Sequence, residues 1–282
     1  MTNHFVKAAV FAAAVGAFSV TAGTADANLK RITIGTNPQG STYFLLGSGF
    51  AKLFQEQLGV RANAQPHAGS SVYLPLMDVG EITLGINSSL DSGMAWSATP
   101  PYKSATKKVR SIARIWVLPY AYMVKESSGI KTLEDLKGKR VVVNFKTNVS
   151  LGQANRTILG SAGLTEADVT AVESGGVVAS IDMVVQDRVD AAPIATGMPQ
   201  LRKAHATVPG GLRIIPVGPL GTDEFMGKGM AGLYTVAEKN SARKPFVKGD
   251  IRVPAFDSYL NAGTQVSDED AYAMAKAIYE NW

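Results

Sequence analysis

The sequence predicts an α/β fold built of two lobes, and three observations lead to that prediction. Short β-rich segments alternate with amphipathic helical segments along most of the 282-residue chain, a pattern typical of parallel sheets flanked by helices. The alternation comes in two series, separated by a long apolar strand near residues 115–125. Because 46% of the residues are apolar and 18% are charged, the chain can bury a sizeable core.

The first series begins with the strand "RITIG", which leads through the polar loop "TNPQGST" into a helix. Apolar residues recur on one face of that helix at helical spacing, namely Leu46, Phe50, Leu53, Phe54 and Leu58. The other expected elements are a strand at 60–66, a helix at 72–81, a strand at 82–86 and a long strand at 109–125 interrupted at Pro119.

The second series begins with a short helix whose start carries Thr132 and Asp135 as a capping pair and whose end is closed by Gly138. A buried strand, "RVVVNF", follows it. The later expected elements are helices at 151–163, 177–190 and 201–208 and strands at 169–173, 191–195 and 212–218. Residues 219–250 are rich in Gly and Lys and are expected to be mostly loop.

These series define the expected domains. The first lobe covers residues 28–119 and is rejoined by residues 253–282, and the second lobe with its return loop covers residues 120–252. A last helix is expected to start at the N-cap Ser267. Its apolar positions are Tyr272, Ala275, Ile278, Tyr279 and Trp282. The chain stops inside this pattern, so we expect the sequence to be truncated at its C-terminus.

The N-terminus has the organisation of an export signal at residues 1–27. Lys7 precedes an apolar run, and an A-x-A cleavage site ends at Ala27. We expect cleavage after Ala27 and a periplasmic mature protein that starts at Asn28. An uncleaved anchor or a buried N-terminal helix is the alternative.

Composition excludes several other classes of protein. The chain has no cysteine and a net charge of +5, and its Lys and Arg residues are scattered. Stability without disulfides must come from the core, and no basic helix with interleaved aromatic residues indicates nucleic-acid binding. We expect a monomer without a nucleic-acid partner.

Polar loops follow the carboxyl ends of the expected strands, where ligands bind in parallel α/β sheets. Hydroxyls, amides and helix N-termini in these loops suit a small anion, most simply a carboxylate. The candidate ligand-binding residues are Gly40, Ser41, Thr42, Tyr43, Ser70, Ser71, Tyr73, Asn87, Ser88, Lys146, Thr147, Asn148, Ser150 and Thr196. The alternatives are helix capping for the small polar residues, a solvated Lys146, and core packing for Tyr43 and Tyr73.

Catalytic patterns are absent from the sequence. No G-x-S-x-G motif occurs, and the "GSTYFLLG" and "GTNPQG" segments fit neither a P-loop nor a dinucleotide fingerprint. No His/Cys/Asp/Glu group has metal-ligand spacing, and Asp91 is the one acid in the crevice loops. We therefore expect no enzyme activity, no metal and no cofactor.

The order of three segments resembles the TAXI family, the solute receptors of tripartite ATP-independent periplasmic (TRAP) transporters. The segments are "ITIGTNPQGSTYFLLGSGFAKLF", "ANAQPHAGSSVYLPLMDVGEITLGINSS" and "GIKTLEDLKGKRVVVNFKTNVS". The resemblance covers about residues 30–218 and the C-terminal helix, and its most specific part is the "G-x-x-x-G-S-T-Y" opening with "Q-P-x-x-G-S". It departs from the family in the second-lobe loop, where "FKTNVS" replaces a Gly/Ser-rich stretch.

The resemblance implies a type II periplasmic binding protein, or Venus flytrap, whose lobes close on a solute and dock on a TRAP permease. The solutes associated with the family are glutamate and related organic acids. By motif position the resemblance assigns ligand binding to Gly40–Tyr43, Ser70, Ser71, Asn87, Ser88 and residues 147–150. Glutamate-like acids, keto acids and dicarboxylates remain open as solutes. A periplasmic sensor or interaction protein and an exported transferase or hydrolase are the alternative functions.

Overall fold

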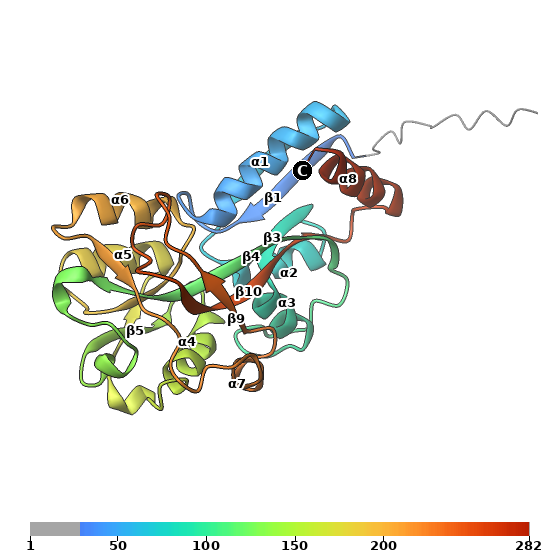
Figure 1. Ribbon diagram of the computed structural model, residues 1–282. Helices are drawn as coiled ribbons and strands as arrows, with labels where there is room; N and C mark the ends of the chain where they lie inside the picture. The colour runs from blue at the N-terminus through green and yellow to red at the C-terminus, as the bar shows by residue number, and fades with distance from the viewer. Residues whose placement is uncertain (1–28, 282) are drawn as a thin grey trace, which may run out of the picture.

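Two long strands, β4 (Arg110–Lys125) and β10 (Ile251–Ala262), run through the middle of the molecule and join its two halves (Figure 1). The computed structural model describes residues 29–281. The expected signal segment at residues 1–27 and Trp282 therefore lie outside the described residues.

The first half, here called the first group, contains the elements before β4 and the last helix. Its three strands are parallel, with the order β2-β1-β3, and β3 continues the sheet to β10. The strands are β1 (Arg31–Thr36), β2 (Arg61–Pro66) and β3 (Leu84–Ser88). The helices are α1 (Thr42–Leu58), α2 (Ser70–Asp78), α3 (Ser89–Trp96) and α8 (Asp268–Glu280).

The second half, here called the second group, contains the elements from the end of β4 to β8. Strands β5 (Arg140–Phe145) and β6 (Thr170–Ser174) are parallel, whereas β7 (Ala192–Ala195) and β8 (Leu212–Ile214) pair antiparallel with the end of β4. The helices are α4 (Leu151–Gly160), α5 (Val177–Val185) and α6 (Pro199–Thr207). Three 3-10 turns complete it: η1 (Glu126–Ser128), η2 (Glu134–Leu136) and η3 (Glu166–Asp168).

The predicted α/β class is confirmed, with parallel strands in each group, but the sheet that joins the groups is mixed. The expected interruption of the long strand at Pro119 is wrong, because β4 continues to Lys125. Up to and including Pro119 the strand pairs with β10, and from Tyr120 it pairs with β7. Pro119 has no N–H to donate, and its carbonyl accepts the amide of Thr196 at 3.0 Å. The proline therefore marks a change of partner.

The prediction that residues 219–250 are mostly loop is confirmed, but the segment also holds a short helix and a strand that were not expected. The segment contains α7 (Asp223–Gly229), capped by Thr222, and β9 (Tyr234–Glu238), which pairs antiparallel with β10. A seven-residue helix is too short to show a helical period in sequence. Strand β9 gains its order from pairing with β10, which a local sequence pattern does not reveal.

Helix α8 begins as expected, since the Ser267 hydroxyl accepts the amide of Asp270 at 3.1 Å. Its expected apolar face is wrong in part. Tyr272 and Tyr279 are 63% and 87% exposed. The helix instead buries small and flexible residues that pack close to α1, namely Ala273, Met274, Ala277 and Ile278.

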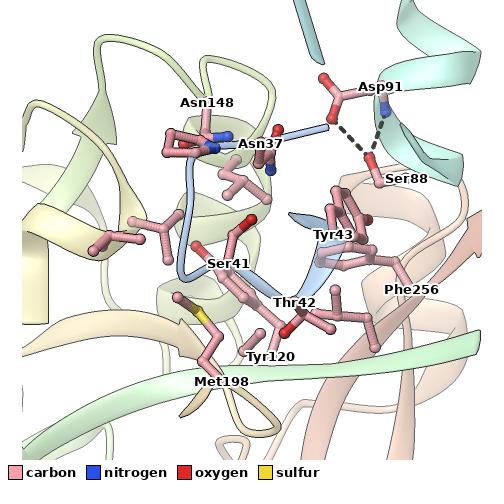
Figure 2. A pocket seen from close by; sticks show the side chains of 16 residues that line it. Asn37, Ser41, Thr42, Tyr43, Ser88, Asp91, Tyr120, Asn148, Met198 and Phe256 are labelled. Atoms are coloured by element: carbon pink, nitrogen blue, oxygen red, sulfur yellow. Dashed lines mark hydrogen bonds between the residues drawn. The ribbon is translucent and has the colours of Figure 1, made fainter. Parts of the chain in front are cut away.

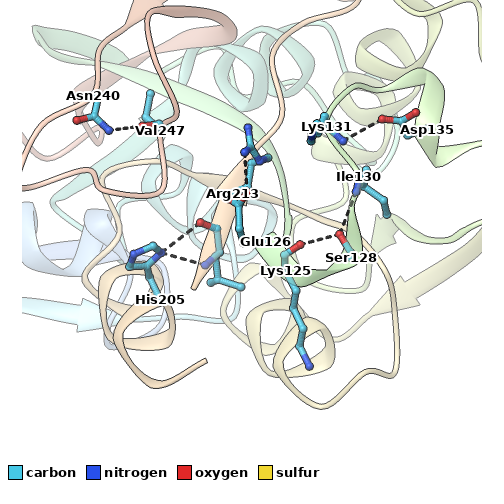
Figure 3. Close-up of polar contacts among 11 residues, drawn as sticks. Lys125, Glu126, Ser128, Ile130, Lys131, Asp135, His205, Arg213, Asn240 and Val247 are labelled. Carbon is cyan, nitrogen blue, oxygen red and sulfur yellow. Dashed lines mark hydrogen bonds and ion pairs between the residues drawn. The ribbon is translucent and has the colours of Figure 1, made fainter. Parts of the chain in front are cut away.

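The capping pair of the second series is present in part: Asp135 accepts backbone amides, but the N-cap of η2 is Leu133 and has no side-chain cap. Asp135 Oδ2 accepts the amides of Lys131 at 2.9 Å and Thr132 at 3.0 Å, and Figure 3 shows the contact with Lys131. In the same region Arg213 of β8 donates to Glu126 at 2.6 Å, which ties β8 to the turn after β4 (Figure 3). These contacts fix the end of the second group farthest from its strand-to-helix loops.

The core face predicted for the first helix is largely present in α1. Phe50 and Phe54 are buried and their rings lie 6.1 Å apart, while Leu46, Leu53 and Leu58 are partly buried against the same cluster. This packing fixes α1 on the sheet and so fixes the loop that precedes it.

Truncation of Phe54 to alanine is expected to lower the free energy of unfolding by about 3–5 kcal/mol, because it leaves a cavity around a fully buried ring. Urea unfolding should show a lower midpoint with an unchanged slope. The control Leu45→Ala lies on the exposed side of α1 and should stay within about 0.5 kcal/mol of the wild type. Equal effects of the two variants would contradict the assigned face.

Candidate functional site

A pocket lies where the strand-to-helix loops of the two groups meet (Figure 2). Its cavity volume is about 70 Å³. Its wall is formed by Asn37, Pro38, Ser41, Thr42, Tyr43, Ser88, Asp91, Leu118, Tyr120, Asn148, Leu151, Val177, Val178, Ala195, Met198 and Phe256. Both groups and both long strands therefore contribute to one site.

The N-terminus of α1 forms one wall. Ser41 caps the helix by accepting the amide of Phe44 at 3.1 Å on its hydroxyl. The amides of Thr42 and Tyr43 stay without an acceptor among the described residues, as expected in a first helical turn. Unpaired amides and the positive end of the helix dipole favour an anion here.

Two side-chain atoms beside that helix end also have no partner in the described part of the chain. Thr42 is only 7% exposed, yet its hydroxyl makes no hydrogen bond. The side-chain oxygen of Asn37 is buried and unpaired as well. Because buried polar groups are nearly always hydrogen-bonded, these two atoms mark unused hydrogen-bonding capacity beside the start of α1.

Tyr43 contributes a hydroxyl from the same turn. Ser258 of β10 donates to this hydroxyl at 3.1 Å, which leaves the phenolic proton free to be donated. Burial raises the pKa of Tyr43 well above its ordinary value. The hydrogen bond from Ser258 lowers this pKa in part, and the charge of Asp91 raises it further. Tyr43 therefore stays protonated at neutral pH and can act as a hydrogen-bond donor.

A carboxylate stands at the start of α3. Ser88 caps this helix through the amide of Asp91 at 2.9 Å and donates its hydroxyl to Asp91 Oδ2 at 2.8 Å (Figure 2). The hydroxyl of Tyr102 donates to the other oxygen at 3.0 Å. Burial, helped by Asp91, raises the pKa of Tyr102, so this donor also keeps its proton.

The opposite wall is mostly apolar. Tyr120 of β4 and Phe256 of β10 pack with ring centroids 5.6 Å apart, and the Tyr120 hydroxyl is satisfied by Asn155 at 3.0 Å. The second group adds Asn148 and several aliphatic side chains, namely Leu151, Val177, Val178 and Met198. No Lys, Arg or His within residues 29–281 lines the pocket.

Five of the predicted site residues lie in this wall: Ser41, Thr42, Tyr43, Ser88 and Asn148. The structure does not bring the others into it. Those residues are Gly40, Ser70, Ser71, Tyr73, Asn87, Lys146, Thr147, Ser150 and Thr196.

Several of these residues have structural partners instead. Tyr73 is fully buried in a separate cluster, where its hydroxyl donates to the carbonyl of Ile86 and contacts Ser70. The Asn87 side chain accepts from Asn261 at 3.2 Å. The Thr196 hydroxyl donates a hydrogen bond to Glu238 at 2.9 Å, and the exposed Lys146 forms an ion pair with Glu173 at 3.9 Å.

Two other predicted segments lie at the contact between the groups. A Cβ atom on Gly69, next to Ser70, would sit 2.0 Å from the carbonyl oxygen of Thr147. A Cβ atom on Gly40, whose φ is +85°, would sit 1.7 Å from Gln200. The backbones of the two groups therefore approach closely at Gly69, whereas at Gly40 the backbone lies against the Gln200 side chain.

The apolar part of the wall escaped the sequence prediction, which considered only polar strand-to-helix loops. Leu118, Tyr120 and Phe256 come from the interiors of the long strands, where core and pocket residues look alike in sequence. Val177 and Val178 open α5 directly after two glycines. The change from Gly-Gly to Val-Val at the start of a helix is the one feature of the sequence that could have indicated these apolar pocket residues.

The described residues contain no group of three or more His, Cys, Asp or Glu side chains that could hold a metal ion. Among the helices of residues 29–281, none combines the length and the apolar character needed to span a bilayer.

Comparison with solved structures places this architecture in the type II periplasmic binding protein fold. PhnD1 from Prochlorococcus marinus (MIT 9301), in complex with methylphosphonate, matches with a TM-score of 0.58 and 15% identity over 89% of this chain and 83% of its own. An ancestral arginine-binding protein bound to arginine matches with a TM-score of 0.55 and 17% identity, over 89% of this chain and 92% of its own. The alkanesulfonate-binding protein SsuA from Xanthomonas axonopodis pv. citri, bound to MOPS, matches with a TM-score of 0.52 and 17% identity, over 89% of this chain and 70% of its own.

The family follows from a separate comparison. The model of the NMT1-like family matches residues 34–282, and the chain belongs to this family.

Replacing Thr42 with valine should leave the melting temperature of the ligand-free protein unchanged or raise it, because an unpaired buried hydroxyl is exchanged for a methyl group of similar size. Thr157 is the matched control, since it is equally buried in a helix but donates to Gln153 at 3.0 Å. Thr157→Val should cost about 1 kcal/mol. A clear loss of stability in Thr42→Val would show that this hydroxyl already has a partner.

Proposed function

We propose that the protein is a solute receptor that captures a small organic carboxylate between its two groups and releases it chemically unchanged. The observation that carries this proposal is the unpaired N-terminus of α1, with the unpaired Thr42 hydroxyl, inside a pocket shared by both groups. The NMT1-like family and the binding-protein fold support it.

The pocket chemistry suits a carboxylate with an apolar body. The amides of Thr42 and Tyr43 and the hydroxyls of Ser41 and Thr42 donate hydrogen bonds to the carboxylate oxygens. The side chains of Tyr120 and Phe256 cover the apolar part of the solute. A water molecule needs roughly 10–15 Å³ of such a cavity. The volume of about 70 Å³ therefore holds a solute of about five to seven heavy atoms, which favours short acids over longer dicarboxylates.

Release requires the pocket to open. We propose that residues 28–119 with 253–282 form one lobe, that residues 120–252 form the other, and that β4 and β10 bend between them. The contacts of Gly40 and Gly69 with the second group then belong to the closed state. The receptor acts as a monomer.

The place and partner of this receptor are proposed from the sequence. The signal segment at residues 1–27 directs the protein to the periplasm, where it is cleaved after Ala27. The resemblance to the TAXI family proposes a TRAP permease as the membrane partner that accepts the solute.

A thermal-shift screen of the mature protein against short organic acids and amino acids tests the function, because a solute that binds only the folded form raises the melting temperature. We expect at least one short carboxylate to raise it. No shift with any acid, in a sample that unfolds cooperatively, would contradict the proposal.

The variant Ser41→Trp should abolish that shift, because a large ring at this 9%-exposed position fills the cavity beside α1. The loss of the cap costs about 1 kcal/mol of stability as well. The matched control is Ser48→Trp, one to two turns further along α1 on its exposed side. The control should keep the shift, and an unchanged dissociation constant in Ser41→Trp would contradict the pocket assignment.

A further inference from the structure

Asp91 is a buried carboxylate in the pocket wall that has no cationic partner. It is 8% exposed. Within residues 29–281 no Lys, Arg or His forms an ion pair with it. Buried charges in proteins are normally paired, so this site carries negative charge that the chain itself does not neutralise.

The hydrogen bonds of Asp91 leave room for a further donor. Each of its oxygens accepts one hydroxyl, from Ser88 at 2.8 Å and from Tyr102 at 3.0 Å. An ionised carboxylate offers about four acceptor positions, so each oxygen retains capacity. The N-terminus of α3 provides only a partial positive charge.

A second acceptor belongs to a residue in the wall of the same cavity. Asn37 lies in the loop between β1 and α1, and its side-chain oxygen is buried without a partner. Figure 2 shows Asn37 and Asp91 among the side chains that line the pocket. Two acceptors and no cation favour a ligand that donates hydrogen bonds and carries positive charge.

We propose that the solute carries an ammonium group that is held by Asp91 and by the side-chain oxygen of Asn37. This inference rests on the proposed function, since the solute carboxylate still lies at the N-terminus of α1. The aliphatic wall then receives a short apolar side chain. The solute class is a small neutral α-amino acid, and a second carboxylate near Asp91 would be repelled.

Calorimetric titration of the mature protein with three matched acids tests this inference. The probes are 2-aminobutyrate, 2-hydroxybutyrate and 2-oxobutyrate, which differ only at carbon 2, and the same comparison is made with the three- and five-carbon homologues. We expect the amino acid to bind roughly 10- to 100-fold more tightly than its partners, the effect of a hydrogen-bonded charge.

The variant Asp91→Asn should remove most of that advantage while affinity for the hydroxy acid changes little. Asp270→Asn is the matched control, because Ser267 and Asp270 cap α8 through the same Ser-x-x-Asp contacts as Ser88 and Asp91, outside the pocket. The control should bind the amino acid like the wild type. Melting curves of both variants verify folding.

The outcomes separate this inference from the function on which it rests. If the hydroxy or oxo acids bind as tightly as the amino acids, or if Asp91→Asn keeps full affinity, the ammonium site is wrong and the carboxylate receptor stands. If no acid of the series binds to folded protein, both are wrong.

Discussion

The antiparallel pairing of β4 with β10 is the contact on which the rest of the structure depends. Eight residues of β10, from Ala255 to Ala262, pair with β4, and the same part of β10 continues the sheet to β3. Beyond Pro119, β4 leaves β10 and pairs with β7 and β8 of the second group. Since both strands cross between the groups, every movement of one group against the other must bend this pair.

This pairing also explains why the pocket has two chemistries. The strands contribute Leu118, Tyr120 and Phe256 from their middle, where the groups meet, and these side chains form an apolar floor. The loops at the ends of β1 and β3 contribute hydroxyls, amides and Asp91. Under the proposed function, a solute with a polar head and an apolar body contacts both walls at once only when the groups are together.

The sequence predicted the parts of the fold that depend on local pattern, and missed those that depend on distant pairing. The cap at Ser267, the Thr132–Asp135 pair and the strand at residues 140–145 follow from residues close in sequence. Strand β9 and the buried face of α8 are set by β10 and α1, so their own residues do not reveal them. Likewise, Ser41 and Thr42 could be placed from a loop before a helix, whereas Tyr73 entered the core because its hydroxyl finds Ile86.

Closure of the two groups around a small carboxylate is the central claim, and a distance measured between them tests it most directly. The chain has no cysteine, so the double variant Leu45→Cys, Lys203→Cys carries two spin labels and no others. Both positions are exposed, one on α1 and one on α6, and pulsed electron paramagnetic resonance measures the distance between the labels. With millimolar 2-aminobutyrate or 2-oxobutyrate we predict one narrow distribution at the separation seen in the structure, and without solute a longer and broader one. Identical distributions in all samples would contradict closure on these solutes.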